Sequence, residues 1–270
     1  MVNFFVSVIE VTFIQIVSVL GIFFVLGFIL AEIQAATLRN YSHSVGWRGI
    51  LWTAWLGTPV HEYGHAFFAL LFRHKITDIV LFSPNPNTGE LGHVNHSYQP
   101  RNFYQNSGNF FIGLAPLIFG PLLLVFLLIV LVPQGREIFN QLTVSQISFA
   151  TIFAGIKKSL ELLFSYSNLS SWRFWVFLYV SFCIASHLAP SRDDRRGAWH
   201  GGLTIIIALF LLNIFALLVQ WDITKYVLDF AYFFAGLITV YIYVLLISVT
   251  HFLLSFLILW PWRKKRPLNI

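Results

Sequence analysis

The residues best suited to chemistry in this chain are the pentapeptide His61-Glu62-Tyr63-Gly64-His65. On a helix, positions i and i+4 lie on one face a turn apart, so both histidines can point a ring nitrogen at one metal ion. Glu62 lies beside the first histidine and can take a proton from a metal-bound water as general base. The pattern predicts a catalytic site with one Zn2+ per chain, because zinc lowers the pKa of bound water toward ~7.

A catalytic zinc takes three protein ligands and keeps one open position, so a third ligand must come from elsewhere. Asp193 and Asp194, in the charged turn 191–196, are the strongest candidates, and we favour Asp194. The alternative is structural, because Ser191 with Asp194 three residues later fits a capping box at the start of a helix. His187 is a further candidate, as a ligand or as the partner of a ligand.

Small residues follow these aspartates. Gly197, Ala198 and Gly201 share a helical face with Asp194. Small residues allow close approach between helices in a membrane. We therefore expect the Asp-bearing helix to pack tightly on the helix that carries the two histidines.

The composition indicates the environment of these residues. Of 270 residues, 57% are hydrophobic and only 10% are charged, against about 25% charged in an average soluble domain. The net charge of +6 comes from basic residues at the ends of apolar segments, which excludes a nucleic-acid partner and favours the lipid bilayer. The only cysteine, Cys183, excludes a thiolate zinc cluster. The first thirty residues have no basic leader and predict a retained membrane helix.

The hydropathy pattern predicts an all-α integral membrane protein with about six transmembrane helices, in a single polytopic domain over 1–270. A span needs ~20 mostly apolar residues. The expected spans are 4–30, 50–72 with the pentapeptide, 109–132, 174–189, 198–221 and 226–260.

Two connections have a pattern of their own. Segments 76–82 and 90–98 alternate in polarity around a turn rich in Pro, Asn and Gly, so a small membrane-associated β-hairpin is expected there. The spacing of apolar residues over 152–163 predicts an amphipathic interfacial helix. His93 and His96 lie three apart on a predicted strand and thus face opposite sides, which argues against a second metal site.

The basic run Arg263-Lys264-Lys265-Arg266 sets the expected orientation. If this run is cytoplasmic, six spans place the N-terminus, the hairpin and the turn 191–196 on the same side. The expected location is therefore a bacterial cytoplasmic membrane, with the active site toward the cytoplasm.

The pentapeptide region resembles the site-2 protease family of intramembrane zinc metalloproteases. The resemblance covers roughly residues 50–125 and is carried by Thr58-Pro59-Val60-His61-Glu62-Tyr63-Gly64-His65-Ala66 and, more weakly, by Gly113-Leu114-Ala115-Pro116-Leu117. It implies zinc ligands at the two histidines, Glu62 as the base, and a membrane-anchored protein as substrate. The Asn-Pro…Asp-Gly motif that usually supplies the third ligand is absent, and Ser191-x-x-Asp194 resembles the substitute of more distant branches.

These patterns together predict a membrane-embedded zinc endopeptidase that hydrolyses peptide bonds within or next to the bilayer. One alternative keeps the chemistry but takes soluble peptides or protein tails as substrates. The other is a non-catalytic membrane scaffold or transporter organised by a metal. An intact Glu62 argues against the latter, because a purely structural metal site needs no base.

Overall fold

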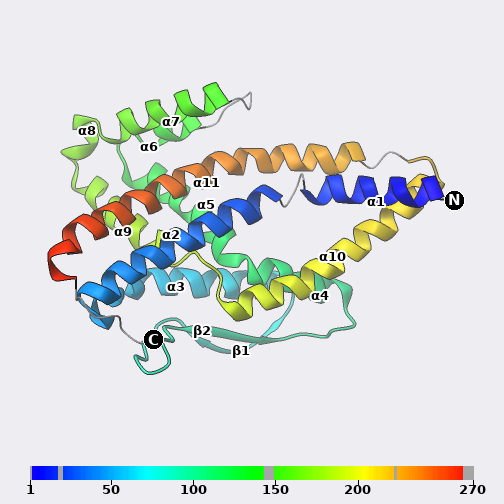
Figure 1. The fold of residues 1–270 in the computed structure, drawn as a ribbon, viewed down its shortest axis with the longest axis horizontal. Helices are drawn as coiled ribbons and strands as arrows, with labels where there is room; N and C mark the ends of the chain where they lie inside the picture. Colours follow the sequence, from blue (N-terminus) through cyan, green and yellow to red (C-terminus); the bar gives the residue numbers. More distant parts are fainter. Residues whose placement is uncertain (1, 18–20, 143–148, 222–223, 264–270) are drawn as a thin grey trace.

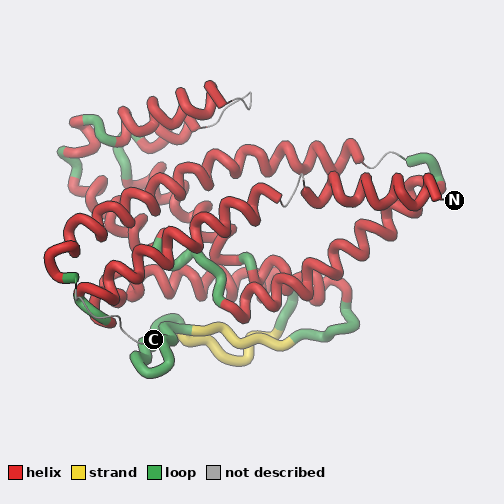
Figure 2. Tube along the Cα trace, in the orientation of Figure 1, coloured by secondary structure: helices red, strands yellow, loops and turns green. Residues whose placement is uncertain are grey.

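The computed structural model describes residues 2–17, 21–142, 149–221 and 224–263. The described chain is mostly helical, with one two-stranded antiparallel hairpin (Figure 1 and Figure 2). The elements in chain order are α1 (Val2–Ile16), α2 (Ile22–Ser44), α3 (Trp47–Leu71), β1 (Lys75–Val80), β2 (His93–Ser97), α4 (Phe103–Gly113), α5 (Ala115–Leu131), α6 (Gly135–Leu142), α7 (Phe149–Leu163), α8 (Tyr166–Leu169), α9 (Trp172–Ala185), α10 (Arg192–Leu218), α11 (Thr224–Leu259) and a 3₁₀ turn (Trp260–Trp262).

Within the described ranges, two helical segments are long and apolar enough to cross a bilayer. They are α10 and the stretch Val240–Trp262, which continues α11 into the 3₁₀ turn. The pair α4 and α5 also qualifies if it is counted as one span with a bend of 60°, which makes three. Two shorter helices, Phe5–Ile16 in α1 and α9, are apolar as well.

The helix breaks differ from the expected spans. Of the first apolar run, residues 18–20 lie outside the described residues, the parts on either side belong to α1 and α2, and α2 continues to Ser44. The span expected over 109–132 is interrupted, since Leu114 separates α4 from α5. Pro116 explains the break, because it has no N–H and favours the first turn of a new helix, where none is needed.

Several helices carry exposed apolar side chains, and on α3 and α10 these form stripes on the molecular surface. At least half of each side chain is exposed in the α3 stripe, which consists of Trp52, Trp55, Tyr63, Phe67 and Leu70. The stripe on α10 includes Trp199, Ile207, Leu211, Phe215 and Leu218. Contiguous exposed apolar surface of this kind is rare on a soluble monomer and fits contact with lipid.

Most of the long helices pack against more than one other helix. In Figure 1, α11 and α2 run side by side, and α3 contacts α5 and α9. The small-residue face of α10 packs on α4, which corrects the expectation that it would pack on α3. The approach is close: a Cβ on Gly201 would lie 2.2 Å from the Phe110 nitrogen, and one on Gly113 would lie 2.2 Å from the Asp194 oxygen. Small residues permit this contact but do not specify the partner helix.

The hairpin is found, with strands shorter than expected. Lys75 pairs with Ser97 and Val80 with His93, and a bulge interrupts the register between Ile76 and Asp78. The hairpin lies along one side of the helical part (Figure 2) and contacts α3.

Three further expectations can be compared with the structure. The helix expected over 152–163 is found as α7. The stretch 191–196, expected as a turn, is helical from Arg192 because Ser191 caps α10. The basic run at 263–266 lies outside the described residues beyond Arg263.

Candidate metal centre

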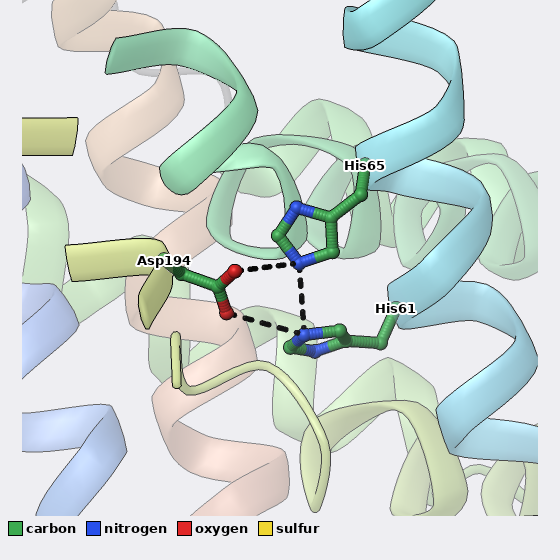
Figure 3. A group of neighbouring side chains, drawn as sticks. All are labelled: His61, His65 and Asp194. Atoms are coloured by element: carbon green, nitrogen blue, oxygen red, sulfur yellow. Dashed lines mark hydrogen bonds and ion pairs between the residues drawn. The ribbon is translucent and has the colours of Figure 1, made fainter. Parts of the chain in front are cut away.

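His61, His65 and Asp194 converge on one point between α3 and the start of α10 (Figure 3). The Nε2 atoms of the two histidines are 3.0 Å apart. Asp194 Oδ1 lies 3.4 Å from Nε2 of His65, and Oδ2 lies 3.7 Å from Nε2 of His61. The three residues form a candidate metal-binding group, with ligand atoms within 4.8 Å of one another.

Each histidine is oriented by a backbone carbonyl. His65 Nδ1 lies 2.8 Å from the Ile112 oxygen, and His61 Nδ1 lies 2.7 Å from the His187 oxygen. A carbonyl only accepts hydrogen bonds, so each Nδ1 must carry the proton. Neutral rings of this tautomer present a lone pair at Nε2 toward the other members of the group. Metal-ligating histidines typically donate their second ring nitrogen to a carbonyl in this way.

The local structure leaves both carbonyls available. Ile112 would normally accept the helical hydrogen bond from residue 116, but Pro116 has no N–H to donate. The His187 carbonyl lies beyond the end of α9 at Ala185. The residue four positions after it, Ser191, gives its N–H to Asp194 instead.

The donor set fits a divalent cation such as zinc. Two Nε2 lone pairs and a carboxylate face one another, and only a proton or a metal ion between them offsets their repulsion. Zinc–ligand bonds of about 2.0–2.1 Å in tetrahedral geometry place neighbouring ligand atoms about 3.3 Å apart. The observed separations of 3.0, 3.4 and 3.7 Å bracket that value. Two histidines with one carboxylate are also a known catalytic zinc set.

Asp194 has both of the roles that the sequence suggested. It is the third residue of α10, and its Oδ2 accepts the Ser191 N–H at 2.7 Å while its own N–H donates to Ser191 Oγ at 3.1 Å. This is a capping box. The same carboxylate faces the histidines, so the cap holds it in place for the metal group. Asp193, the other candidate, is exposed and lies outside the group.

Glu62 is buried next to the group, with 6% of its surface exposed. Among the described residues it has no hydrogen bond or ion pair, although electrostatic interactions reach it from His61 and Asp194 in the group and from His93 and Glu90 in the hairpin. A buried carboxylate without a fixed internal partner is destabilising. Such a group is typical of a functional site rather than of a packing position.

His187 is not part of the metal group. Its ring is buried with Nδ1 3.1 Å from the Cys183 oxygen, and its Nε2 has no hydrogen-bond partner in the described structure. Its backbone carbonyl contacts the group, through Nδ1 of His61. Asn109 is also buried, and its amide donates to Asn106 at 3.2 Å.

The hairpin histidines have different surroundings, as expected for opposite faces of a strand. His93 lies between Asp78 and Glu90, at 2.8 and 2.7 Å, and these hydrogen bonds raise the pKa of His93. His96 contacts His74, with 2.9 Å between the Nδ1 atoms, and burial lowers the pKa of His96 to about 4.

Sequence reasoning missed the residues that hold the loop between α9 and α10. Gln34 of α2 accepts the Ala189 N–H at 2.7 Å. Ser186 contacts His251 of α11 at 2.8 Å. The loop thus brings both the His187 carbonyl and Asp194 to the group from a fixed position. The available signal was a glutamine within a long helical segment, which needs a hydrogen-bond partner where it is buried.

No protein-family model, curated protein or solved structure matches the chain.

Proposed function

We propose that the chain is a membrane-embedded zinc metalloprotease of the site-2 protease type. The observation that carries the proposal is the convergence of two carbonyl-oriented histidines and a capped aspartate beside the buried Glu62. A scaffold site would need the first three residues but not the glutamate. The proposal includes six spans, a place in a bacterial cytoplasmic membrane and a site open toward the cytoplasm.

The ligands in this proposal are His61, His65 and Asp194, and their side chains are only partly accessible, at 14%, 7% and 18%. A zinc ion held there would supply a Lewis acid and lower the pKa of a water molecule. The low solvent exposure strengthens every electrostatic interaction with the reacting groups.

Glu62 is the general base and then the general acid. It would accept a proton from the water whose oxygen bonds to the peptide carbonyl carbon. As the C–N bond breaks, it would return that proton to the leaving amine nitrogen. Its position directly after His61 on α3 keeps its carboxylate next to the metal group through both transfers.

The substrate class follows from the surroundings of the site. The lipid-compatible stripes on α3 and α10 favour a membrane-anchored protein. Among the described strands, β1 and β2 pair only with each other, so each has an unpaired edge. An unwound substrate segment could add there as a strand, which would expose a peptide bond that a helix shields.

The test compares Glu62→Gln with the wild type. The amide keeps the size but removes the base, so zinc content should stay near one per chain, while cleavage of co-expressed single-span proteins falls ~10²–10⁴-fold. His61→Ala should abolish zinc binding. The protease proposal fails if the wild type and Glu62→Gln yield the same fragments. It also fails if neither protein cuts while both retain the cellular phenotype, and the scaffold alternative then gains support.

The aspartate pair offers a matched control. Asp194→Asn removes the charge inside the group and should lower zinc content and cleavage together. Asp193→Asn removes the same charge from the adjacent, exposed position and should leave both unchanged. The reverse result would make Asp193 the ligand and contradict the geometry.

A further inference from the structure

A second polar site lies where the C-terminal ends of α2 and α11 come together (Figure 1). A cavity of about 410 Å3 opens there, lined by Ala36, Arg39, Asn40, His43 and Arg263. Three of these five residues are basic or can become so, and no carboxylate of the described residues lines the cavity. It is separate from the metal group, which α3 and α10 form.

The guanidinium of Arg263 is held in a fixed orientation. One nitrogen donates to Oδ1 of Asn40, which is buried and in turn donates to Ser255 at 3.0 Å. The guanidinium also lies 4.4 Å from the ring centroid of Phe256 and 5.3 Å from that of Trp260. An arginine has five N–H donors, so this anchoring uses few of them and leaves the rest for a ligand.

The positive charge of the cavity is not neutralised from within. Neither Arg39 nor Arg263 forms an ion pair in the described part of the chain. Two permanently charged guanidinium groups beside one cavity repel each other unless an anion lies between them. Planar N–H forks match the oxygen atoms of a phosphate, to which arginine forms paired hydrogen bonds.

The cavity lies beside the end of a candidate membrane span. The apolar segment Val240–Trp262 ends immediately before Arg263. Its last residues include Trp260 and Trp262, which are 58% and 60% exposed. Exposed tryptophans at the end of a span are typical of the headgroup region, and basic pockets between helices at this depth bind anionic lipid headgroups.

We infer that the cavity between α2 and α11 binds the phosphate headgroup of an anionic phospholipid, with Arg39 and Arg263 holding the phosphate oxygens. This inference is independent of the proposed protease activity. A bound lipid would join the ends of α2 and α11 at the membrane surface.

Native mass spectrometry of the detergent-solubilised full chain tests the site. Phosphatidylglycerol should remain bound at concentrations where phosphatidylcholine does not. Arg39→Gln with Arg263→Gln should weaken phosphatidylglycerol binding about 25-fold, from about fivefold for each of the two charges. The matched control is Arg48→Gln, which removes one exposed charge near the same end of α2 without touching the cavity and should change binding less than about twofold.

Equal binding of the two lipids would overturn the inference, and so would a loss of phosphatidylglycerol binding in Arg48→Gln as large as in the double variant. Displacement of the lipid by an equal concentration of glycerol phosphate would also overturn it, because it would indicate a site for a soluble anion. If the double variant does not fold, as judged by size-exclusion chromatography, the single variant Arg39→Gln decides. Arg39 is exposed, and its loss should still weaken binding about fivefold.

Discussion

Gly113→Ala tests whether the contact between α4 and α10 sets the position of Asp194. A Cβ at this position would lie 2.2 Å from the Asp194 carbonyl oxygen and 2.7 Å from the Ala198 nitrogen. Ordinary contact begins near 3.4 Å, so the start of α10 must move away by about 1.2 Å, the difference between 3.4 and 2.2 Å. Metal sites tolerate deviations of only about 0.2 Å in ligand distance. We expect zinc affinity to fall about 10–100-fold, and overpacking to destabilise the fold by about 1–3 kcal/mol.

Gly197→Ala is the matched control. Among the described residues outside this stretch of α10, the Asn109 oxygen is the one atom within 4 Å of a Cβ there, at 4.0 Å. Alanine also favours the helix, so stability should stay equal or rise by up to about 1 kcal/mol. Zinc affinity would be measured by competition with a chromophoric chelator, and folding by thermal unfolding in the same detergent. If Gly113→Ala binds zinc as tightly as Gly197→Ala, the close packing of α4 on α10 does not position the ligand.

Two further perturbations probe the surroundings of the site. Gln34→Leu keeps the side-chain volume but removes the acceptor of the Ala189 N–H. The free energy of unfolding should fall by about 1–3 kcal/mol, and zinc should bind more weakly. An unchanged melting temperature and zinc affinity would contradict a role of this hydrogen bond in holding the loop. In the hairpin, the pKa of His93 is raised and that of Asp78 is lowered. The stabilisation of the hairpin by His93 is therefore complete below the unfolded pKa of histidine, about 6.5. It is lost as the pH rises through the folded pKa of His93. The stabilisation of the hairpin by Asp78 is lost only as the pH falls toward the folded pKa of Asp78. A spin label in the hairpin turn should therefore gain mobility as pH rises above about 6.5, and Asp78→Asn with Glu90→Gln should abolish the change.

The part of the site that the sequence predicts is local. The spacing of His61 and His65 places them on one face of any helix, and Glu62 is next to the first of them whatever the tertiary fold. The third member needed a contact across more than a hundred residues. Only residue type and an assumed topology pointed to Asp194, which is why Asp193 remained an alternative until the orientation of α10 was known.

Helix continuity and helix partners were less predictable. Hydropathy measures average apolarity and does not detect the break at Leu114, although Pro116 marks it. The glycines of α10 indicated a close contact, but the sequence does not say with which helix, and the partner proved to be α4. The two orienting carbonyls were also hidden, because backbone groups carry no sequence signal of their own.

The capping role and the metal role of Asp194 were alternatives in the sequence, and the structure shows why they are compatible. A carboxylate has two oxygens with about four acceptor sites. The Ser191 N–H uses one site on Oδ2, and Oδ1 is left facing His65. The cap fixes the rotation of the side chain before any metal binds, so part of the ordering entropy of the ligand is lost during folding rather than on binding. A capping box that includes a metal ligand thus orients the side chain of that ligand. Ser-x-x-Asp at the start of a helix indicates this arrangement only where two histidines face the aspartate.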